Sequence, residues 1–340
     1  MNSERPIGIA GAGSIGCFVG GMLAAAGRRV ALLARPRVIG EITAHGLRLT
    51  SFDGFDRRLA ANQLTLSDNP DVFADAAIVL VTVKSADTAG MADIIARYAA
   101  GDAVIVSLQN GVGNAALLRE KLPGRRVLGG MVPYNVIALG EGRFHRATSG
   151  DIVIERDAGG TADKLSVPDL KMRATDNIVG VQWGKLLFNL NNALNALANL
   201  PLRQQLAQRP WRKLYADQVE EALAAIKAEG IKPVSTAPLP VSWMPPLLRL
   251  PDALFEVVLG RTMKIDPEAR SSMWEDLQRG RRTEIDYLQG VITAIAARRG
   301  LATPLSRRIK PRRRLAPTPI PCWRRSGFHL GRSPRCGLSA

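Results

Sequence analysis

Cysteine and histidine are scarce in this 340-residue chain, which has three of each. Cys17, Cys322 and Cys336 are too few for a disulfide framework or a cysteine-rich metal cluster, so we expect a reducing, cytoplasmic setting. Three histidines leave little for a histidine-based catalytic triad, and we expect no metal site. No apolar run approaches the ~18 residues of a membrane span, and the amino end lacks the pattern of a signal peptide.

Acidic residues are missing from the end of the chain, where none follows Asp286. From Leu305 onward there are ten Lys/Arg; without them, 36 basic residues face 30 acidic ones, and the net charge falls from +16 to +6. The basic character therefore belongs to the tail, and nucleic acid is not the expected partner of the folded body. We interpret residues 309–340 as a disordered product of a shifted reading frame. The alternative is a functional basic arm that binds nucleic acid or an anionic membrane.

Short apolar runs separated by helix-sized segments fill the first half of the chain. Near-continuous apolar runs of this kind are typical of a parallel sheet that is covered on both faces. Long helical patterns follow from about residue 182, with a proline-rich interruption at 232–251. We predict a Rossmann-type α/β domain over residues 1–175 and an all-helical domain over residues 176–308. The apolar runs are IGIAGAGSIGC (7–17), RRVALLAR (28–35), AAIVLVTVK (76–84), AVIVSLQNG (103–111) and RRVLGGMVPYNV (125–136).

The first apolar run leads into a G-x-G-x-x-G pattern formed by Gly11, Gly13 and Gly16. Such glycines permit a tight turn and close approach of a dinucleotide pyrophosphate, which the following helix N-terminus favours. The alternative is an ordinary glycine-rich turn. At the end of the second run, where an NAD enzyme places an acid, the chain has Arg35 and Arg37. A guanidinium suits a 2′-phosphate, so we expect NADPH; the alternative is a solvated charge at a strand end.

Two further polar residues follow apolar runs directly. Lys84 ends the third run, and Asn110 stands near the end of the fourth. Ligands of open α/β sheets bind beyond the carboxyl ends of the strands, so we expect both side chains to face the cofactor. Turn chemistry is an equal alternative, because Asn-Gly pairs favour turns.

The stretch VQWGKLLFNLNNALNALANL (181–200) is typical of one long apolar helix, yet it carries a lysine and several asparagines. Lys185, Asn189 and Asn192 are spaced i, i+4, i+7, which places them along one stripe of that helix. A buried lysine needs a partner or a chemical role. The alternative is that Lys185 reaches the surface while the asparagines pair between helices.

The segment SSMWEDLQRGRRTEIDYLQG (271–290) predicts two short helices. Ser272 begins a capping-box pattern, S-x-x-E, and Gly280 is a plausible helix stop, which lets the amino ends of the two helices converge. A cap serine with free backbone N–H groups can hold a carboxylate. Glu284, in the first turn of the second helix, is favoured in its ionised form and suits the Lys185 ammonium as a partner.

These motifs together resemble the ketopantoate reductase (2-dehydropantoate 2-reductase) family. The matching pieces cover residues 5–308 in order and spacing; they are GAGSIG, the arginine after the second strand, VTVKS, LQNGVGN, GGMVPYNV, WGKLLFNLNNALNAL and SSMWEDLQRGRRTEIDYLQG. The resemblance implies a Rossmann domain, a helical domain and an active site in the cleft between them. It also implies NADPH-dependent reduction of 2-dehydropantoate to pantoate, a step toward coenzyme A.

The same resemblance implies a role for each candidate residue. Lys185 is the general acid, and Glu284 is its partner. The substrate is contacted by Asn110, Asn189, Asn192 and Ser272, and the cofactor by Gly11, Gly13, Gly16, Arg35, Lys84 and Asn110. The chain departs from the family at Ala193, where a second substrate asparagine is common, and at Gln289 in the usual DYLNG.

Chemistry agrees with this interpretation, because hydride delivery to a ketone leaves an alkoxide that an ammonium can protonate. The expected partner is thus a small 2-keto acid, and a homodimer is compatible with the interpretation. Two rival functions remain at this stage. One is a related NADP-dependent dehydrogenase acting on another 2-keto or hydroxy acid; the other is a non-catalytic NADPH-binding sensor.

Overall fold

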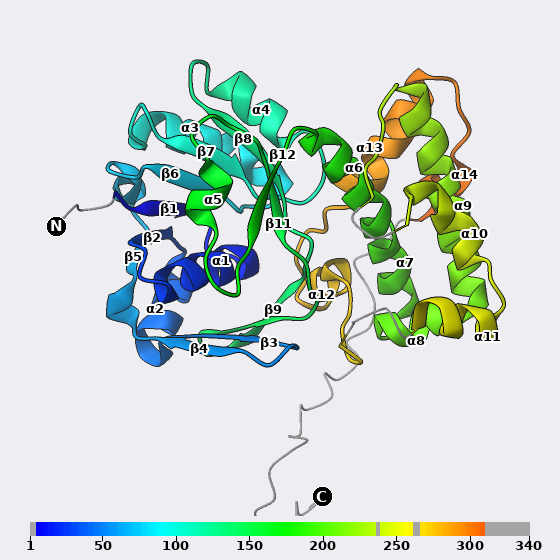
Figure 1. Ribbon diagram of the computed structural model, residues 1–340, viewed down its shortest axis with the longest axis horizontal. Helices are drawn as coiled ribbons and strands as arrows, with labels where there is room; N and C mark the ends of the chain where they lie inside the picture. Colours follow the sequence, from blue (N-terminus) through cyan, green and yellow to red (C-terminus); the bar gives the residue numbers. More distant parts are fainter. Residues whose placement is uncertain (1–4, 236–238, 261–265, 310–340) are drawn as a thin grey trace, which may run out of the picture.

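The computed structural model describes residues 5–235, 239–260 and 266–309. An α/β body holds the amino-terminal half of the chain, and a helical body lies beside it (Figure 1). This arrangement confirms the expected fold class of a Rossmann-type domain followed by an all-helical one. The basic tail over residues 309–340 was predicted to be disordered; its first residue, Ile309, is instead buried in the helical core, and residues 310–340 lie outside the described residues. Within the described ranges, no helix combines the length and the apolar character needed to cross a membrane.

The larger sheet has eight strands in the order β12-β11-β8-β7-β6-β1-β2-β5. The strands from β5 to β8 in this order all pair in parallel, whereas β11 runs antiparallel to β8. From β1 the chain builds outward first on one side and then on the other, so a crevice opens beyond the carboxyl ends of β1 and β6. The bounds are β1 (Ile7–Ala10), β2 (Val30–Leu33), β5 (Thr65–Ser67), β6 (Ile78–Val81), β7 (Val104–Ser107), β8 (Val127–Met131), β11 (Ile152–Glu155) and β12 (Met172–Thr175).

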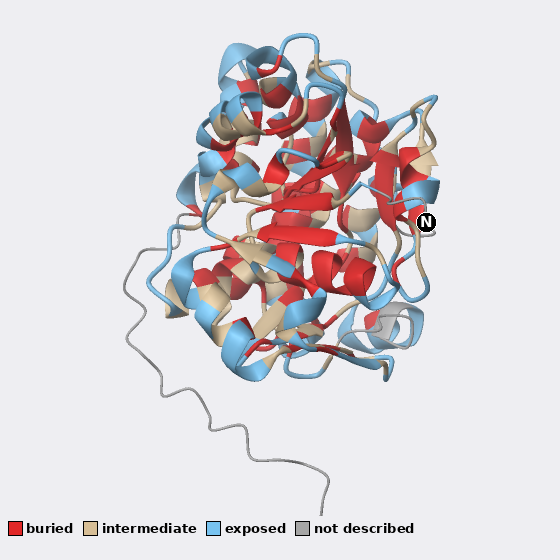
Figure 2. Ribbon diagram, turned by 90° about the vertical axis from the view of Figure 1, so that its left-hand side faces the viewer, coloured by how far each residue is buried: buried red, intermediate tan, exposed pale blue. Residues whose placement is uncertain are grey.

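Two hydrophobic clusters cover the two faces of this sheet, because successive side chains of a strand point to opposite sides. On β6, Ile78 and Leu80 join the cluster around α1 (Ser14–Ala25), and Val79 and Val81 join the cluster that includes α3 (Thr88–Tyr98) and α4 (Asn114–Lys121). The central strands are buried on both sides (Figure 2). This two-sided burial explains why the strands are near-continuously apolar.

A second sheet of four strands, in the order β4-β3-β10-β9, was not anticipated from the sequence. Only one of its faces is buried, so its strands carry many polar residues; β4 is DRRL and β10 is RFHR. Leu47 and Leu49 of β3 pack under α1, where a Cβ on Gly21 would lie 2.5 Å from Leu47 Cδ2. The bounds are β3 (Leu47–Ser51), β4 (Asp56–Leu59), β9 (Val136–Gly140) and β10 (Arg143–Arg146), and α2 (Pro36–His45) precedes β3.

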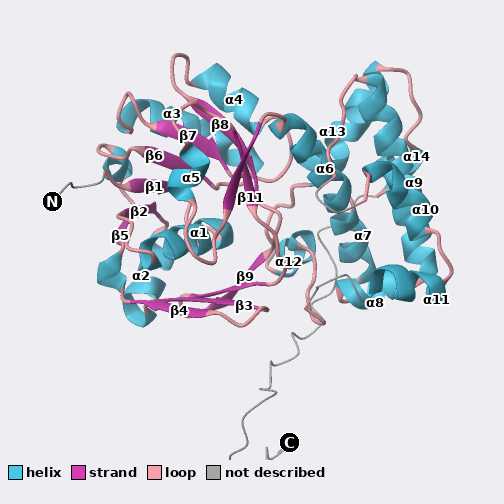
Figure 3. Cartoon of the chain, viewed as in Figure 1, coloured by secondary structure: helices cyan, strands magenta, loops and turns pink. Residues whose placement is uncertain are grey.

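The helical domain follows β12 and contains helices from α6 onward (Figure 3). The segment 181–200, expected to be one helix, is divided at Leu190 into two. Side chains from other helices take the carbonyls near this point: the Tyr215 hydroxyl donates to Leu187 O and Phe188 O, and Gln289 donates to Leu190 O. Insertion of such groups interrupts a helical ladder. The helices are α6 (Ile178–Asn189), α7 (Asn191–Ala198), α8 (Leu202–Ala207), α9 (Arg209–Ala228), α10 (Met244–Leu248), α11 (Asp252–Phe255), α12 (Ser272–Gln278), α13 (Ile285–Arg298) and α14 (Pro304–Arg308).

Arg212 of α9 is fully buried and holds the outer part of this domain together. Its guanidinium donates to carbonyls on both sides, among them Leu206 O at 2.9 Å and Leu250 O at 2.7 Å. It also pairs with Asp252 at 2.8 Å and lies over the Phe255 ring at 4.1 Å. One cation therefore satisfies carbonyls at the ends of α8 and α10 that have lost contact with water.

Replacing Arg212 with alanine should lower the free energy of unfolding by about 3 kcal/mol, because several buried carbonyls lose their donor. The matched control is Asp252→Ala: its side chain is 63% exposed, so the loss should stay below about 1 kcal/mol. Urea unfolding followed by circular dichroism measures both. Equal stability of Arg212→Ala and the parent would contradict the assigned role.

Candidate active site

The glycine loop after β1 has the geometry of a dinucleotide cradle. Gly11 has φ +110°, and a Cβ on Gly16 would lie 2.2 Å from Gly11 O, so larger residues do not fit at either position. At Gly13, which caps α1, a Cβ would meet no atom within 4 Å, so the backbone faces open space. A pyrophosphate can therefore approach the amino end of α1 closely. This close approach is what binding of a nicotinamide dinucleotide at such a loop would require.

A groove of about 350 Å³ lies against this loop. Its lining includes Gly13 and Arg37 from the sheet domain, and Arg279 and Arg281 from the helical domain. Arg37 also forms an i, i+4 ion pair with Glu41 at 3.0 Å. Both domains thus contribute to one cavity beside the glycine loop.

Arg35, predicted to bind the 2′-phosphate, is exposed at the amino end of α2 and is not part of the groove lining. The nearby Arg37, in contrast, does line the groove. The sequence placed both arginines after the second strand, and the geometry favours Arg37 as the guanidinium that faces the groove. Arg35 as a cofactor ligand stays a prediction.

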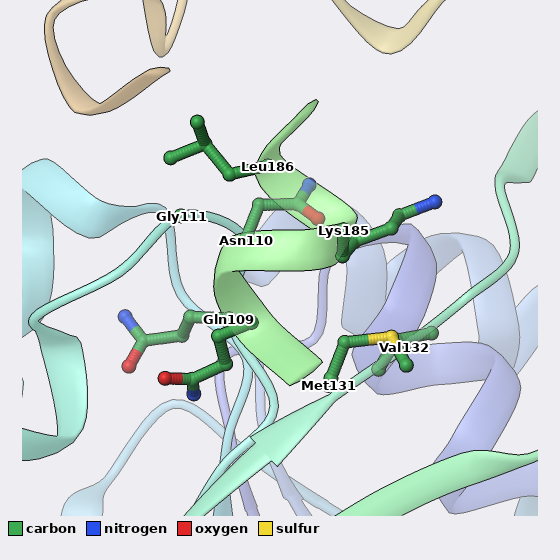
Figure 4. Close-up of a pocket in the computed structure, with 8 residues that line it drawn as sticks. Gln109, Asn110, Gly111, Met131, Val132, Lys185 and Leu186 are labelled. Atoms are coloured by element: carbon green, nitrogen blue, oxygen red, sulfur yellow. The ribbon is translucent and has the colours of Figure 1, made fainter. Parts of the chain in front are cut away.

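A second, small pocket brings together Lys185 and Asn110, two residues that are far apart in the sequence (Figure 4). Its volume of about 10 Å³ leaves room for roughly one water molecule. The loop after β7, the end of β8 and helix α6 supply its walls. The lining residues are Gln109, Asn110, Gly111, Met131, Val132, Gln182, Lys185 and Leu186.

The Lys185 ammonium donates a hydrogen bond to the Pro133 carbonyl at 2.8 Å. It forms no ion pair within the described ranges. Burial of the amine lowers its pKa from 10.5 to about 8, because the charged form loses hydration without gaining an anionic partner. A proton donor with a pKa close to the working pH is well suited to general acid catalysis.

Glu284 lies at the amino end of α13, as expected, but it does not pair with Lys185 in this structure. Its Oε1 instead accepts hydrogen bonds from the backbone N–H and the hydroxyl of Ser85, both at 3.2 Å. Two donors from one loop hold the carboxylate against the carboxyl end of β6, while Lys185 has the Pro133 carbonyl. The prediction of a direct Lys185–Glu284 contact is therefore wrong for this structure, in which Lys185 contacts Pro133 and Glu284 contacts Ser85.

Lys84 also contacts the helical domain. Its Nζ pairs with the buried Asp276 at 2.6 Å and donates to the carbonyl of Arg282 at 3.0 Å. Lys84 thus lies at the carboxyl end of β6, where it was expected, but its ammonium points to α12 and to the turn after it. Its contact with a cofactor stays a prediction.

The expected cap of α12 was one residue late. Ser271, rather than Ser272, is the N-cap, and its hydroxyl accepts from Trp274 N at 3.2 Å. Ser271 is fixed there because its own N–H donates to Asn195 Oδ1 at 2.8 Å and its hydroxyl donates to Asn192 O at 2.9 Å. Ser272 is the first residue of the helix.

Four of the asparagines in the 181–200 stretch divide into two groups. Asn191 and Asn195 form a buried network with Gln205, so these amides pair between helices, as one alternative proposed. Asn189 is buried at the end of α6, and Asn192 lies partly buried near the start of α7. The structure does not place Asn189, Asn192 or Ser272 in the Lys185 pocket, so their contacts with substrate stay predictions.

Several residues of the site were not identified from the sequence. Asn114, the last residue of the quoted LQNGVGN motif, donates to the Asn110 carbonyl at 2.9 Å and to the Ser85 hydroxyl at 3.1 Å. Its Oδ1 accepts from Thr88 at 3.0 Å. This buried network fixes two loops. One carries Asn110, and the other carries Ser85, which binds Glu284. The LQNGVGN motif could have identified Asn114. No sequence signal could have identified Pro133, because it contacts Lys185 through its backbone carbonyl, which every residue has.

Comparison with known proteins identifies relatives over most of the chain. The family model "Ketopantoate reductase PanE/ApbA" matches residues 7–159, and "Ketopantoate reductase PanE/ApbA C terminal" matches residues 177–310. The 2-dehydropantoate 2-reductase of Halobacterium salinarum is 29% identical over 320 residues, which cover 91% of this chain and 97% of that protein.

Solved structures give the same result. A PanE/ApbA family ketopantoate reductase from Ralstonia eutropha JMP134 is 33% identical, with a TM-score of 0.74 over 89% of this chain and 95% of that one. A 2-dehydropantoate 2-reductase from Geobacter metallireducens is 27% identical, with a TM-score of 0.73 over 89% and 96%. A D-mandelate dehydrogenase solved with NADH and anilino(oxo)acetate shares the fold, at 23% identity and a TM-score of 0.74 over 89% and 96%.

Lys185→Met should raise the free energy of unfolding at pH 7 by about 1 kcal/mol, because the variant no longer desolvates an unpaired ammonium but loses one hydrogen bond to Pro133. The native pKa lies below the unfolded one, so the gain is full below pH 8 and fades as the pH rises to 10.5. Urea unfolding at pH 7 and pH 10 tests this. A variant less stable than the parent at pH 7 would show that the amine is structural.

Proposed function

The chain belongs to the ketopantoate reductase family, and we propose that it reduces 2-dehydropantoate to pantoate with NADPH, on the way to coenzyme A. The observation that carries the proposal is the Lys185 ammonium, whose pKa is lowered to about 8, in the same pocket as Asn110. This pocket lies at the carboxyl side of the sheet, as does the glycine loop, which is where open α/β sheets bind their ligands.

The residues around the glycine loop fit a nicotinamide dinucleotide. NADPH, when bound, would supply the hydride. Gly11, Gly13 and Gly16 would hold its pyrophosphate at the amino end of α1. An arginine, Arg35 or Arg37, stands after β2 where NAD enzymes have an acid, which supports the phosphorylated cofactor. Lys84 and Asn110, at the ends of β6 and β7, would complete the binding site.

Lys185 would act as the proton donor. Reduction of the keto carbon breaks the carbon–oxygen π bond and leaves negative charge on oxygen, and the Lys185 Nζ transfers a proton to it. The neutral amine then regains a proton from solvent. Before this transfer the ammonium stabilises the growing charge in a pocket with little water. The Pro133 carbonyl directs the Nζ, and Asn110 lines the same pocket.

The other site residues would orient the two domains and the substrate. Glu284, held by Ser85, joins the start of α13 to the loop after β6 and thereby keeps the helical domain against the sheet. Asn189, Asn192 and Ser272 are our candidates for the hydroxyl and carboxylate groups of the keto acid. A homodimer and a cytoplasmic location also stay predictions.

Lys185→Ala should lower kcat for 2-dehydropantoate by about 10²- to 10⁴-fold, the usual contribution of a positioned general acid. The Kd of NADPH, measured by calorimetry, should stay within threefold. Lys213→Ala, which removes an exposed lysine of α9, is the matched control and should retain full turnover. Near-normal kcat in Lys185→Ala would refute the proton-donor role. Other 2-keto acids, tested as substrates of the parent, would reveal a different preference.

The kcat/KM of the parent enzyme should fall about tenfold per pH unit above pH 8. The lowered pKa of Lys185 means that the proton needed for transfer is present below about 8 and lost above it. Lys185→Arg keeps its charge at these pH values, so its residual rate should not show this decline. A profile of the parent that is flat from pH 7 to 10 would contradict the assignment.

A further inference from the structure

Arginines from both domains meet at the groove beside the glycine loop. Arg37 comes from α2, whereas Arg279 and Arg281 come from the segment that follows α12. Among the described residues that line the groove, Glu41 is the one carboxylate, so three cations face one anion. Glu41 is already engaged, since it pairs with Arg37 and accepts from Gly142 N at 3.2 Å. The lining therefore has an excess of positive charge next to a helix N-terminus.

The segment after α12 is held at the groove by contacts to the sheet domain. Arg279 donates to Ala138 O of β9 at 2.9 Å, which fixes its guanidinium at the edge of the second sheet. Just before it, Asp276 pairs with Lys84 at 2.6 Å. The backbone turns at Gly280, with φ +63°, and Arg281 N then donates to Asp276 O at 2.7 Å. The position of Arg281 against the glycine loop is thus built by the fold.

The Arg281 guanidinium has no hydrogen-bond or ion-pair partner within the described part of the chain. It is exposed to the groove, whereas other arginines of the helical domain, such as Arg212 and Arg249, are paired. A guanidinium presents a fork of donors that matches phosphate oxygens. A cavity of about 350 Å³ is large enough for a phosphorylated part of a dinucleotide.

We propose that Arg281, supported by Arg279, binds a phosphate group of the dinucleotide from the helical domain, opposite the glycine loop and Arg37. The inference rests on the proposed function, because it takes the groove to be the cofactor site. Its content is separate: the cofactor is held by both domains, and part of its affinity comes from residues outside the Rossmann unit. Bound cofactor then fixes the helical domain against the sheet.

Isothermal titration of NADPH and NADH to the full-length protein tests this proposal without relying on turnover. Arg281→Ala should weaken NADPH binding about 10- to 100-fold, as expected for loss of a charge-assisted contact to phosphate. Arg281→Glu should weaken it further, and Arg279→Ala less, since Arg279 is partly engaged by Ala138. The matched control is Arg298→Ala, which removes an exposed arginine paired with Glu229 and should leave the Kd unchanged.

The two cofactors distinguish the phosphate that is bound. A loss confined to NADPH assigns Arg281 to the 2′-phosphate, and an equal loss with NADH assigns it to the pyrophosphate; both support the proposal. An unchanged NADPH Kd in Arg281→Ala and Arg281→Glu, with circular dichroism like that of the parent, overturns it while the proposed function stands. A parent protein that binds neither cofactor overturns the proposed function itself.

Discussion

The seating of α6 on the end of β8 is the constraint on which the position of Lys185 depends. On one side of the helix, Gln182 donates to Gly130 O and Lys185 to Pro133 O, so two side chains one turn apart follow the chain as it leaves β8. On the other side, a Cβ on Gly184 would lie 1.8 Å from Val234 O. Only glycine at this position allows the backbone at Val234 to pack against the helix. The helix is fixed between the two, and its lysine reaches the pocket with no anionic partner among the residues that the structure describes.

Polar links join the two domains at the loop after β6, beside an apolar contact in which Ile178 and Val181 of α6 pack against Met131 and Val153. Lys84 meets Asp276, and Ser85 meets Glu284. Each of these links comes from the loop after β6; Lys84 reaches α12, and Ser85 reaches the amino end of α13. The same loop is braced from behind by Asn114. A short stretch of the sheet domain therefore determines where the second half of the site lies.

The sequence was most informative where local chemistry determines structure. Apolar runs identified the central strands because both faces of the sheet are covered. Gly16 identified the glycine loop because no larger residue fits beside Gly11 O. The sequence was least informative where residues that are distant along the chain determine the local structure. The break at Leu190 depends on Tyr215 and Gln289 from other helices, and the cap at Ser271 rather than Ser272 depends on Asn195. The amphipathic second sheet was missed because its polar strands lack the apolar signature.

The placement of the groove's two walls along the chain has a consequence for biosynthesis. Every strand of the larger sheet lies between residues 7 and 175, so the glycine loop and its helix leave the ribosome well before residues 279–281. Chains are synthesised from the amino end, and domains generally fold as units in that order. A nascent chain thus carries only half of the arginine-lined cavity. Under our proposal, the newly synthesised Rossmann unit would bind a dinucleotide more weakly than the completed polypeptide, because Arg279 and Arg281 are not yet present.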